Sequence, residues 1–318
     1  MALDTLSYSL KVARMYYYQE LSTQEIADSL GLSRSKVSRL LSYAKSQGLV
    51  EIRILDPHIE ANSLENELKQ TFNLPFVHVV HVADSAPEEE ALNRVATVAA
   101  AYLNSIIEPK QILALAWGTT VSAISKKLSP KKLLELQVVQ LNGSGNTHDA
   151  GISYSSEILR RFADAYGAQS HPFPVPTFFD YPETKTALWK ERSIKRLLKL
   201  QSEADILLYS IGAFDAGVPS HVYTGNYLEA KDLKELKKEA VVGDIATVFF
   251  RADGSYGDIP LNARASGPDL KLFAKAKHAL CAVAGKAKIT GLKAALKGGY
   301  LNKLIIDEPS ARQLLVDG

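Results

Sequence analysis

Short apolar runs alternate with longer helical stretches over most of this chain, and that alternation limits the possible folds more than any other feature. The apolar runs stand at residues 76–80, 111–117, 136–141, 205–211, 247–250, 279–284 and 304–306. A strand that returns to its sheet through a helix runs parallel to its predecessor. We therefore predict an α/β domain from about residue 73, with a mostly parallel, Rossmann-like sheet.

Length and composition favour a chain of two domains with a real core. A typical domain holds about 100–200 residues, so 318 residues predict two. Apolar residues make up 46% and charged residues 23%, which excludes a mainly disordered chain. The single cysteine, Cys281, excludes a disulfide within the chain and favours the cytoplasm. No apolar run approaches the ~18 residues that span a membrane, so we expect no membrane partner.

The head of the chain is predicted to form a separate helix–turn–helix domain. Ser22 and Glu25 have the spacing of a capping box, which marks the start of a helix, and Gly31 can end that helix in a tight turn. Ser33 then begins a further helix. The run 47–54 that follows is typical of a turn and a strand, which a winged variant would use as its wing. The helix before them carries one apolar stripe, formed by Leu6, Leu10, Ala13 and Tyr17.

The last helix of this head is basic, with no acid between Ser33 and Lys45. In a helix–turn–helix it enters the major groove, where arginine reads guanine edges while serine and lysine hold phosphates. The residues expected at the DNA are Thr23, Ser33, Arg34, Ser35, Lys36, Ser38 and Arg39. The alternative is an ordinary three-helix cap with a basic, solvated face. The capping box, the acid-free helix and the separate N-terminal position favour DNA binding.

Polar, glycine-rich turns follow three of the predicted strands, at residues 117–120, 142–147 and 211–214. Ligands of open parallel sheets bind at the carboxyl ends of the strands. Glycines with hydroxyls before a helix suit a phosphate or another anion. The first two turns do not match the glycine pattern of a nucleotide site. Each turn taken singly could be plain cap chemistry, but three in one sheet favour a ligand crevice.

The order of these segments resembles the SorC family of sugar-responsive bacterial transcription regulators. The resemblance covers nearly the whole chain and rests on a series of motifs, which is specific where each motif alone is weak. In order they are LSTQEIADSLGLSRSKVSRLLSYAKSQGLVEI, LALAWGTTVSAI, VVQLNGSG, VPTFF, DILLYSIGAF, GDIATVFFRADG and AVAGKAKITGLKAALKGGYLNKLIIDEPSARQLL.

The resemblance implies two domains and two partners. Residues 1–56 would form a winged helix–turn–helix, and residues 57–318 an effector and oligomerisation domain similar to sugar-phosphate isomerases and deaminases. The implied partners are double-stranded operator DNA and a phosphorylated sugar or polyol, bound by a homodimer or homotetramer. No cofactor is implied.

The turns and the resemblance together assign the effector site. Its expected residues are Gly118, Thr119, Thr120, Asn142, Gly143, Ser144, Gly145, Gly212, Asp244 and Lys288. In the family, the turn 118–120 matches the phosphate cradle, and Lys288 matches a lysine that reaches the phosphate. Asp244 matches an acid near the sugar hydroxyls, and 143–144 a second loop. Some relatives place a lysine after the central strand, where an aldehyde can form an imine. Asn142 stands there in this chain, which favours reversible binding.

An enzyme of the isomerase or deaminase type is the competing hypothesis. Asp244, Asp253 and Lys288 could do acid–base work. Against it, no paired carboxylate or histidine–acid constellation stands out, and the helix–turn–helix head has no part in catalysis.

Two remaining features carry weaker expectations. The segment 171–179, with its three prolines, is either a loop that closes over the site or a rigid surface crossover. His148 and His221 lack partners at metal-ligand spacing, so we expect no metal site.

Overall fold

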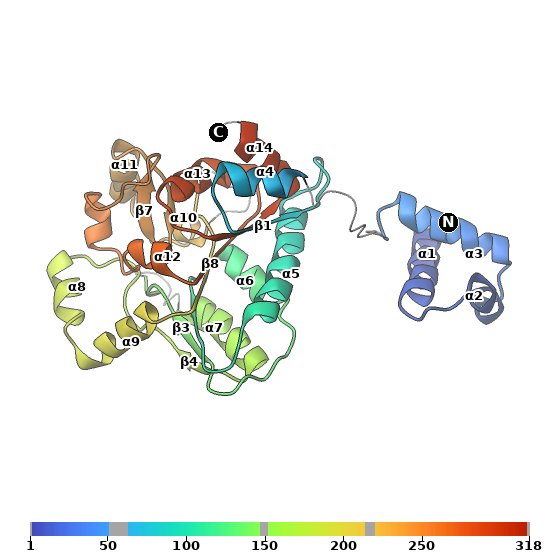
Figure 1. Ribbon diagram of the computed structural model, residues 1–318, viewed down its shortest axis with the longest axis horizontal. Helices are drawn as coiled ribbons and strands as arrows, with labels where there is room; N and C mark the ends of the chain where they lie inside the picture. The colour runs from blue at the N-terminus through green and yellow to red at the C-terminus, as the bar shows by residue number, and fades with distance from the viewer. Residues whose placement is uncertain (1, 51–62, 147–151, 214–219, 317–318) are drawn as a thin grey trace. The chain divides into compact units, whose positions relative to one another are not determined.

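The computed structural model describes residues 2–50, 63–146, 152–213 and 220–316 (Figure 1). The chain divides into two compact units, residues 1–60 and 61–318. The expected domain boundary between residues 56 and 57 lies outside the described residues, as do residues 51–54 of the expected wing.

Three helices make up the described part of the smaller unit: α1 (Ala2–Tyr17), α2 (Thr23–Leu30) and α3 (Arg34–Ser46). The predicted capping box is present, because the Glu25 amide donates to the Ser22 hydroxyl at 3.3 Å and the Ser22 amide donates to the Glu25 carboxylate at 2.8 Å. Gly31 ends α2 with a φ of 63°, a left-handed conformation that costs glycine little. Ser33 caps α3 by accepting from the Lys36 amide. These contacts confirm the helix–turn–helix.

The apolar stripe of α1 packs into the core only in its second half, at Ala13 and Tyr17. Leu6 and Leu10 are exposed, whereas Ser9, Val12 and Ala13 are buried. Tyr17 packs against the core beside Ala13, so the prediction fails for Leu6 and Leu10 and holds for the other two residues. The buried apolar side chains of this unit are Val12, Ala13, Ile26, Ala27, Val37, Leu40, Leu41 and Ala44.

The larger unit is built on a sheet of seven parallel strands, which confirms the predicted fold class. The strands are β1 (Phe76–Val80), β2 (Ile112–Leu115), β3 (Gln137–Gln140), β4 (Gln169–His171), β5 (Ile206–Tyr209), β8 (His278–Val283) and β9 (Lys303–Asp307). Their order across the sheet is β1-β9-β8-β5-β2-β3-β4. From β2 the chain proceeds to β3 and β4 on one side. From β5 it proceeds to β8 and β9 on the other, so the winding direction reverses between β2 and β5.

Helices cover both faces of this sheet (Figure 1). One core contains α5 (Glu88–Ile106), α6 (Thr119–Ser125) and α7 (Ile152–Tyr166). The opposite core contains α4 (Ser63–Thr71), α13 (Ile289–Lys297) and α14 (Glu308–Val316). Successive residues of one strand enter opposite cores, as Leu207 and Leu208 of β5 do. This alternation is why the strands read as continuous apolar runs.

The run 247–250 does not join the parallel sheet, which corrects the prediction. It belongs to an antiparallel pair, β6 (Val241–Ile245) and β7 (Val248–Arg251). Only Ala246 and Thr247 connect the two strands. A parallel neighbour needs a crossover of a dozen or more residues, so this connection allows a hairpin alone.

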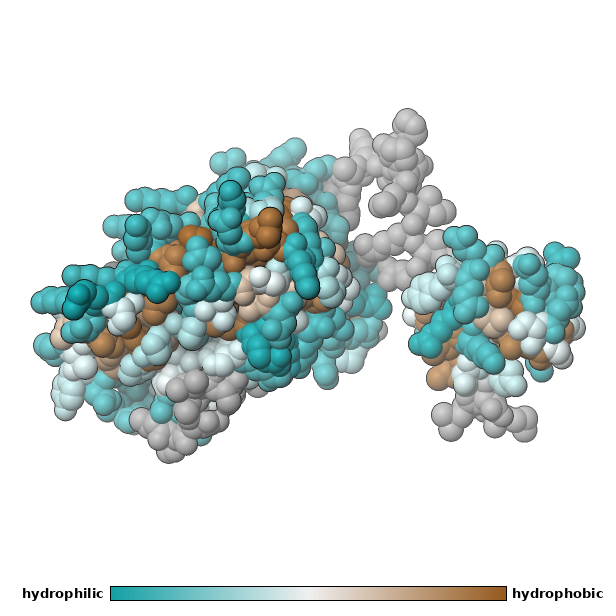
Figure 2. Space-filling view, turned by 90° about the horizontal axis from the view of Figure 1, so that it is seen from below, coloured by the Kyte–Doolittle hydropathy of each residue, from teal (hydrophilic) through white to brown (hydrophobic). Residues whose placement is uncertain are grey.

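Short helices complete the larger unit. They are α8 (Pro182–Leu188), α9 (Arg192–Ser202), α10 (His221–Thr224), α11 (Ala230–Lys238) and α12 (Lys271–Lys275), with 3-10 turns at Pro260–Ala263 and Lys286–Lys288. On the face seen in Figure 2, hydrophilic side chains surround a band of apolar ones.

Candidate functional site

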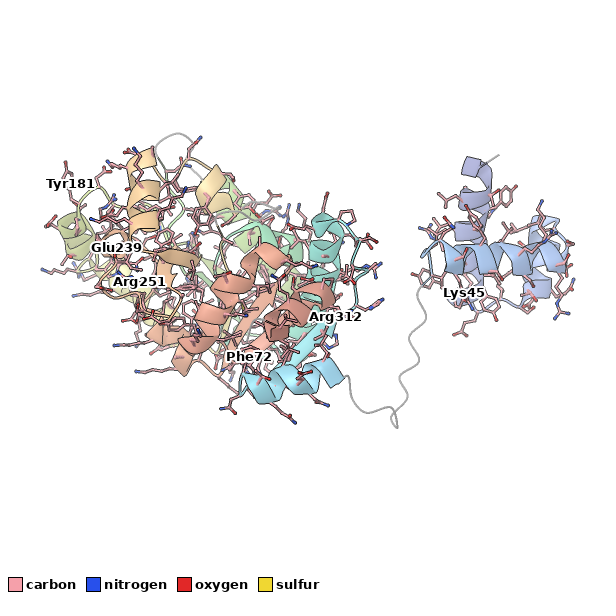
Figure 3. All side chains as sticks on the ribbon, turned by 90° about the horizontal axis from the view of Figure 1, so that it is seen from above. Lys45, Phe72, Tyr181, Glu239, Arg251 and Arg312 are labelled. Atoms are coloured by element: carbon pink, nitrogen blue, oxygen red, sulfur yellow. The ribbon has the colours of Figure 1, made fainter. Side chains whose placement is uncertain are left out.

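The predicted DNA-facing residues lie on the solvent side of the helix–turn–helix. Val37 and Leu40 of α3 point into the core. All the predicted residues are exposed except Thr23, which is half-buried. Its hydroxyl accepts from the Arg34 side chain at 3.3 Å, so α2 and the start of α3 are tied together. Lys45, labelled in Figure 3, lies exposed in the last turn of α3.

A small polar cavity opens at the point where the winding direction of the sheet reverses. Its volume is about 40 Å³. Six segments meet there, although several of them lie far apart in the chain. The lining residues are Ala116, Trp117, Gly118, Thr119, Thr120, Val121, Asn142, Ser210, Ile211, Gly212, Ser220, Val222, Asp244, Ala246, Thr247 and Lys288. This is the edge at which doubly wound sheets bind ligands.

Lys288 supplies a buried cation to this cavity. Its ammonium donates to the Thr120 hydroxyl at 3.2 Å and to the Ser210 hydroxyl at 3.4 Å. Burial lowers the pKa of Lys288, and the nearby Cys281 and Asp244 oppose that shift. A cation held between two hydroxyls matches the oxygens of a phosphate in charge and in hydrogen bonding.

Asp244 supplies a buried acid at the same cavity. Its carboxylate accepts from the Tyr223 hydroxyl at 2.9 Å and from the Thr247 amide at 3.1 Å. Burial raises the pKa of Asp244 to about 6, although these hydrogen bonds and Lys288 work against the shift. Gly212 is required beside it, because a Cβ there would lie 1.9 Å from a carboxylate oxygen of Asp244.

Asn142 is the least satisfied polar residue of the cavity. The residue is 1% exposed, and no group among the described residues hydrogen-bonds to its amide nitrogen or its amide oxygen. A buried polar group left unpaired costs about 1–3 kcal/mol. The Asn142 amide can therefore both donate and accept hydrogen bonds with a ligand in the cavity.

The turn after β2 contributes both of its threonines. Gly118 has a φ of 154°, which other residues adopt only with strain. The Tyr154 hydroxyl of α7 is hydrogen-bonded to Thr119 and Ser122, and burial raises the pKa of Tyr154. Thr120 is 2% exposed and receives the Lys288 bond, so the turn and the cation are coupled.

In the second loop, Asn142 lines this cavity, whereas Gly143, Ser144 and Gly145 do not. Gly143 packs against the chain at Val175, where a Cβ would lie 2.3 Å from the carbonyl oxygen. Ser144 and Gly145 line a separate cavity of about 910 Å³. Of the ten predicted effector residues, these three do not reach the cavity, and the other seven line it.

The proline-rich segment 171–179 does not line the cavity. Phe173 and Thr177 are buried, and Thr177 hydrogen-bonds to Gly143 and Gly145. The segment packs against the second loop through these contacts, while Pro172, Pro174 and Pro176 are exposed.

Sequence reasoning missed four functional neighbours of this cavity. Ser210 could have been found, because it is a hydroxyl at the end of a predicted strand. Trp117 was visible in the turn but carries no ligand signature. Its indole donates to the Gly143 carbonyl at 2.9 Å and so fixes the loop. Tyr223 and Thr247 had no signal, since only the folded chain brings them to Asp244.

The structure brings together only part of the acid–base set that an enzyme would need. Asp253 is exposed at the far end of the hairpin, outside the residues lining the cavity. Among the described residues, no group of three or more histidines, cysteines or acids could hold a metal ion. His148 and the side chain of His221 lie outside the described part. No helix within the described ranges has the length and apolar content needed to cross a membrane.

Known proteins are similar to this chain along nearly its whole length. A family of sugar-binding domains matches residues 56–316, and the region 4 family of sigma-70 factors matches residues 10–47. The "Deoxyribonucleoside regulator" of Bacillus subtilis (strain 168) is 34% identical over 312 residues, which are 97% of each chain.

Two solved structures are similar as well. One is described as "a domain of a possible sugar-binding transcriptional regulator" from Arthrobacter aurescens TC1. It has a TM-score of 0.75 and 44% identity, and the match covers 82% of this chain and 99% of that one. The other is the full-length sorbitol operon regulator SorC from Klebsiella pneumoniae. It has a TM-score of 0.75 and 25% identity, and the match covers 97% of this chain and 98% of that one.

Proposed function

The chain belongs to the SorC family of sugar-binding transcriptional regulators, and from that premise we propose that a phosphorylated sugar or polyol in the Lys288 cavity controls its affinity for operator DNA. The relatives are named as regulators of transcription, so the regulator hypothesis holds and the enzyme alternative is not supported. DNA and a sugar effector are its partners. The proposal adds that this effector carries a phosphate group.

The buried Lys288 ammonium carries this proposal. An unphosphorylated sugar has no negative charge to offset a cation that burial already disfavours. A phosphate would accept from Lys288 and from the hydroxyls of Thr119, Thr120 and Ser210. The sugar hydroxyls would then pair with Asn142 and Asp244, since the Asn142 amide has no partner among the described residues and carboxylates accept hydrogen bonds from hydroxyls.

We further propose residues 1–56 as the DNA-binding domain and 57–318 as the effector and oligomerisation domain. Operator DNA lies in the bacterial cytoplasm, so the protein would act there. A homodimer or homotetramer would read two half-sites with two α3 helices, because half-site symmetry mirrors protein symmetry.

Binding of named phosphosugars tests the effector claim. Deoxyribose 5-phosphate and sorbitol 6-phosphate are suitable probes, because the relatives are named for deoxyribonucleosides and sorbitol. Deoxyribose and sorbitol serve as uncharged controls. Trp117 lines the cavity and Trp189 does not, so Trp189→Phe leaves one fluorescent reporter at the site.

Lys288→Met should weaken binding of the phosphosugar about 10- to 100-fold, because it removes a charged hydrogen bond. Lys286→Met is the matched control, since Lys286 lies exposed on the same 3-10 turn. Equal affinity for the phosphorylated and the plain sugar, or equal losses in the two variants, would refute the phosphate assignment.

A further inference from the structure

Asp244 ties three separate segments together at the cavity. Its carboxylate accepts from Tyr223 of α10 and from the Thr247 amide in the turn between β6 and β7. Its backbone also pairs with Gly212 beyond β5, with N···O distances of 2.9 and 3.3 Å. Both carboxylate oxygens are therefore engaged by donors of the protein itself, although the side chain lines the ligand cavity.

The cavity is too small for a sugar phosphate unless one of these groups moves. Its volume of about 40 Å³ has room for a few water molecules. Pockets for small organic ligands hold about 300–1,000 Å³. A sugar hydroxyl that reaches Asp244 enters space beside the two donors already there, and it gains room when it takes the place of one of them.

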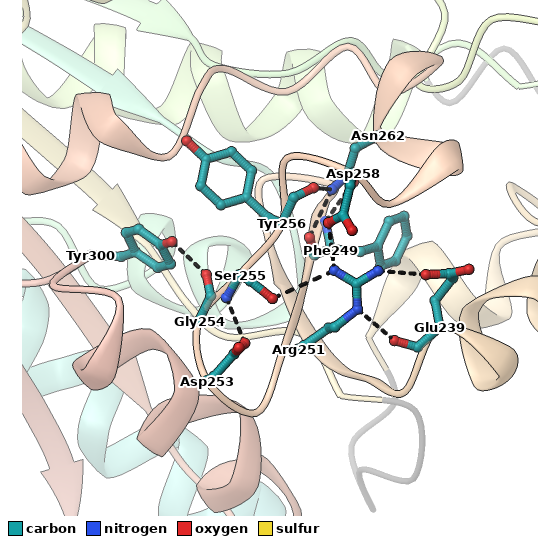
Figure 4. Close-up of polar contacts among 10 residues, drawn as sticks. All are labelled: Glu239, Phe249, Arg251, Asp253, Gly254, Ser255, Tyr256, Asp258, Asn262 and Tyr300. Carbon is teal, nitrogen blue, oxygen red and sulfur yellow. Dashed lines mark hydrogen bonds and ion pairs between the residues drawn. The ribbon is translucent and has the colours of Figure 1, made fainter.

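The Thr247 amide is poorly placed to leave. It belongs to a two-residue turn between paired strands, and the other end of the hairpin is anchored (Figure 4). The Arg251 guanidinium contacts the Asp258 carboxylate at 2.6 Å and the Glu239 carboxylate at 2.5 Å. Moving the amide would disturb this whole unit.

Tyr223 is the group that can be exchanged. It lies on α10, a helix of only four residues, and its half-buried ring packs near Phe249, with the ring centroids 6.4 Å apart. Its phenolic O–H donates to the carboxylate in the same way as a sugar hydroxyl would. Exchanging one O–H for the other keeps the number of hydrogen bonds to Asp244 constant and opens space beside it.

Resting on the proposed function, we propose that Tyr223 competes with the effector for Asp244, so that effector binding releases Tyr223 and loosens α10. This makes Tyr223 a specificity-determining residue. An analogue that lacks the hydroxyl facing Asp244 has nothing to exchange and leaves Tyr223 in place. A missing hydrogen-bond partner is the strongest basis on which a polar site rejects an analogue.

Tyr223→Phe in the full chain tests the competition, with deoxyribose 5-phosphate and sorbitol 6-phosphate titrated by calorimetry. Removing the competitor should tighten binding of the phosphosugar about fivefold, which is about 1 kcal/mol. Tyr227→Phe is the matched control, because that hydroxyl donates to the Ser144 carbonyl instead of Asp244. It should leave the affinity unchanged.

Hydrogen exchange of the peptide covering 221–228 supplies a second readout on the unmodified protein. The bound phosphosugar should speed exchange in α10 of the wild type, whereas Tyr223→Phe should exchange fast with or without it. Weaker binding by Tyr223→Phe, or slower exchange in α10 on binding, would overturn the competition and make Tyr223 an ordinary ligand contact. Absence of binding by wild type and variant alike would instead refute the proposed function, and this inference with it.

Discussion

Asn142 has two polar atoms that no group in the described structure satisfies, and this sets stability against function at one residue. Asn142→Leu should raise the free energy of unfolding by about 1 kcal/mol, because an apolar side chain of similar size removes an unpaired buried amide. The same change should weaken binding of the phosphosugar at least tenfold. Chemical denaturation with and without the ligand measures both effects.

Asn302 provides the control for that substitution. Its side chain accepts from the Ala279 amide and donates to the Ala276 carbonyl, at 2.9 and 2.8 Å. Asn302→Leu should therefore lower the free energy of unfolding by about 1–3 kcal/mol. A comparable loss in Asn142→Leu would show that Asn142 has a structural partner.

Asp244 should make the stability of the fold depend on pH. Its pKa is raised from 3.8 to about 6 by burial, so the folded state holds the proton more tightly than the unfolded state. The stabilisation is present below pH 3.8 and is lost as the pH rises through 6. The loss is about 3 kcal/mol, from about 1.36 kcal/mol per pKa unit.

The side chain of the Asp244→Asn variant cannot ionise. Between pH 4 and pH 7, its free energy of unfolding should therefore rise relative to that of the wild type. Asp258→Asn should behave in the opposite sense, because Arg251 holds the pKa of Asp258 below its ordinary value. As the pH falls, the difference in free energy of unfolding between the wild type and Asp258→Asn should therefore shrink. Parallel curves for wild type and Asp244→Asn would contradict the buried acid.

At the scale of elements, sequence reasoning succeeded where local chemistry decides the outcome. The α2–α3 turn was predictable because Ser22, Glu25, Gly31 and Ser33 act on backbone groups within four residues of themselves. The exposure of Leu6 and Leu10 was not, since the positions of α2 and α3 along α1 decide which of its side chains are buried. The position of the 247–250 run failed because the short connection to an unpredicted strand was overlooked.

In the candidate site, too, local sequence predicts some residues, and contacts between distant segments determine the others. Residues directly after strands β2, β3 and β5 were predictable, because parallel strands bring their carboxyl ends to one edge. The inward packing of Gly143 depends on Val175, about thirty residues later, and no local pattern reports it. The same holds for Tyr223, which meets Asp244 only through the fold.

The basic face of α3 should dominate binding to DNA of any sequence. Nonspecific affinity depends on counterion release, and its logarithm falls with the logarithm of salt concentration by about 0.9 per phosphate contact. Lys36→Ala should therefore reduce the slope by about one on a duplex of arbitrary sequence. Fluorescence anisotropy between 50 and 200 mM salt measures it.

Lys11→Ala removes the same charge from the exposed side of α1 and should leave the slope unchanged. Equal reductions in the two variants would mean that α3 does not present the DNA-binding face. The comparison needs no knowledge of the operator, since phosphate contacts carry no sequence information.

At the scale of the whole molecule, effector binding in one compact unit must be thermodynamically coupled to DNA binding by the other if the effector is to control DNA binding. Such coupling is reciprocal: the factor by which the phosphosugar changes the affinity for DNA equals the factor by which DNA changes the affinity for the phosphosugar. Both affinities can be measured on one protein, with a duplex selected from a random pool and the phosphosugar found by calorimetry. We expect matching factors of about 5–150.

Lys288→Met tests whether effector binding can be removed without a change in DNA binding. Because Lys288 lies in the cavity of the larger unit, the variant should keep the ligand-free affinity for DNA and lose the response to the phosphosugar. Arg39→Ala, in the smaller unit, should do the reverse: it should weaken DNA binding but keep the affinity for the phosphosugar. A Lys288→Met protein with altered DNA affinity in the absence of ligand would place this cation in the coupling itself, because its contacts with Thr120 and Ser210 would then bias the DNA-binding state before any effector arrives.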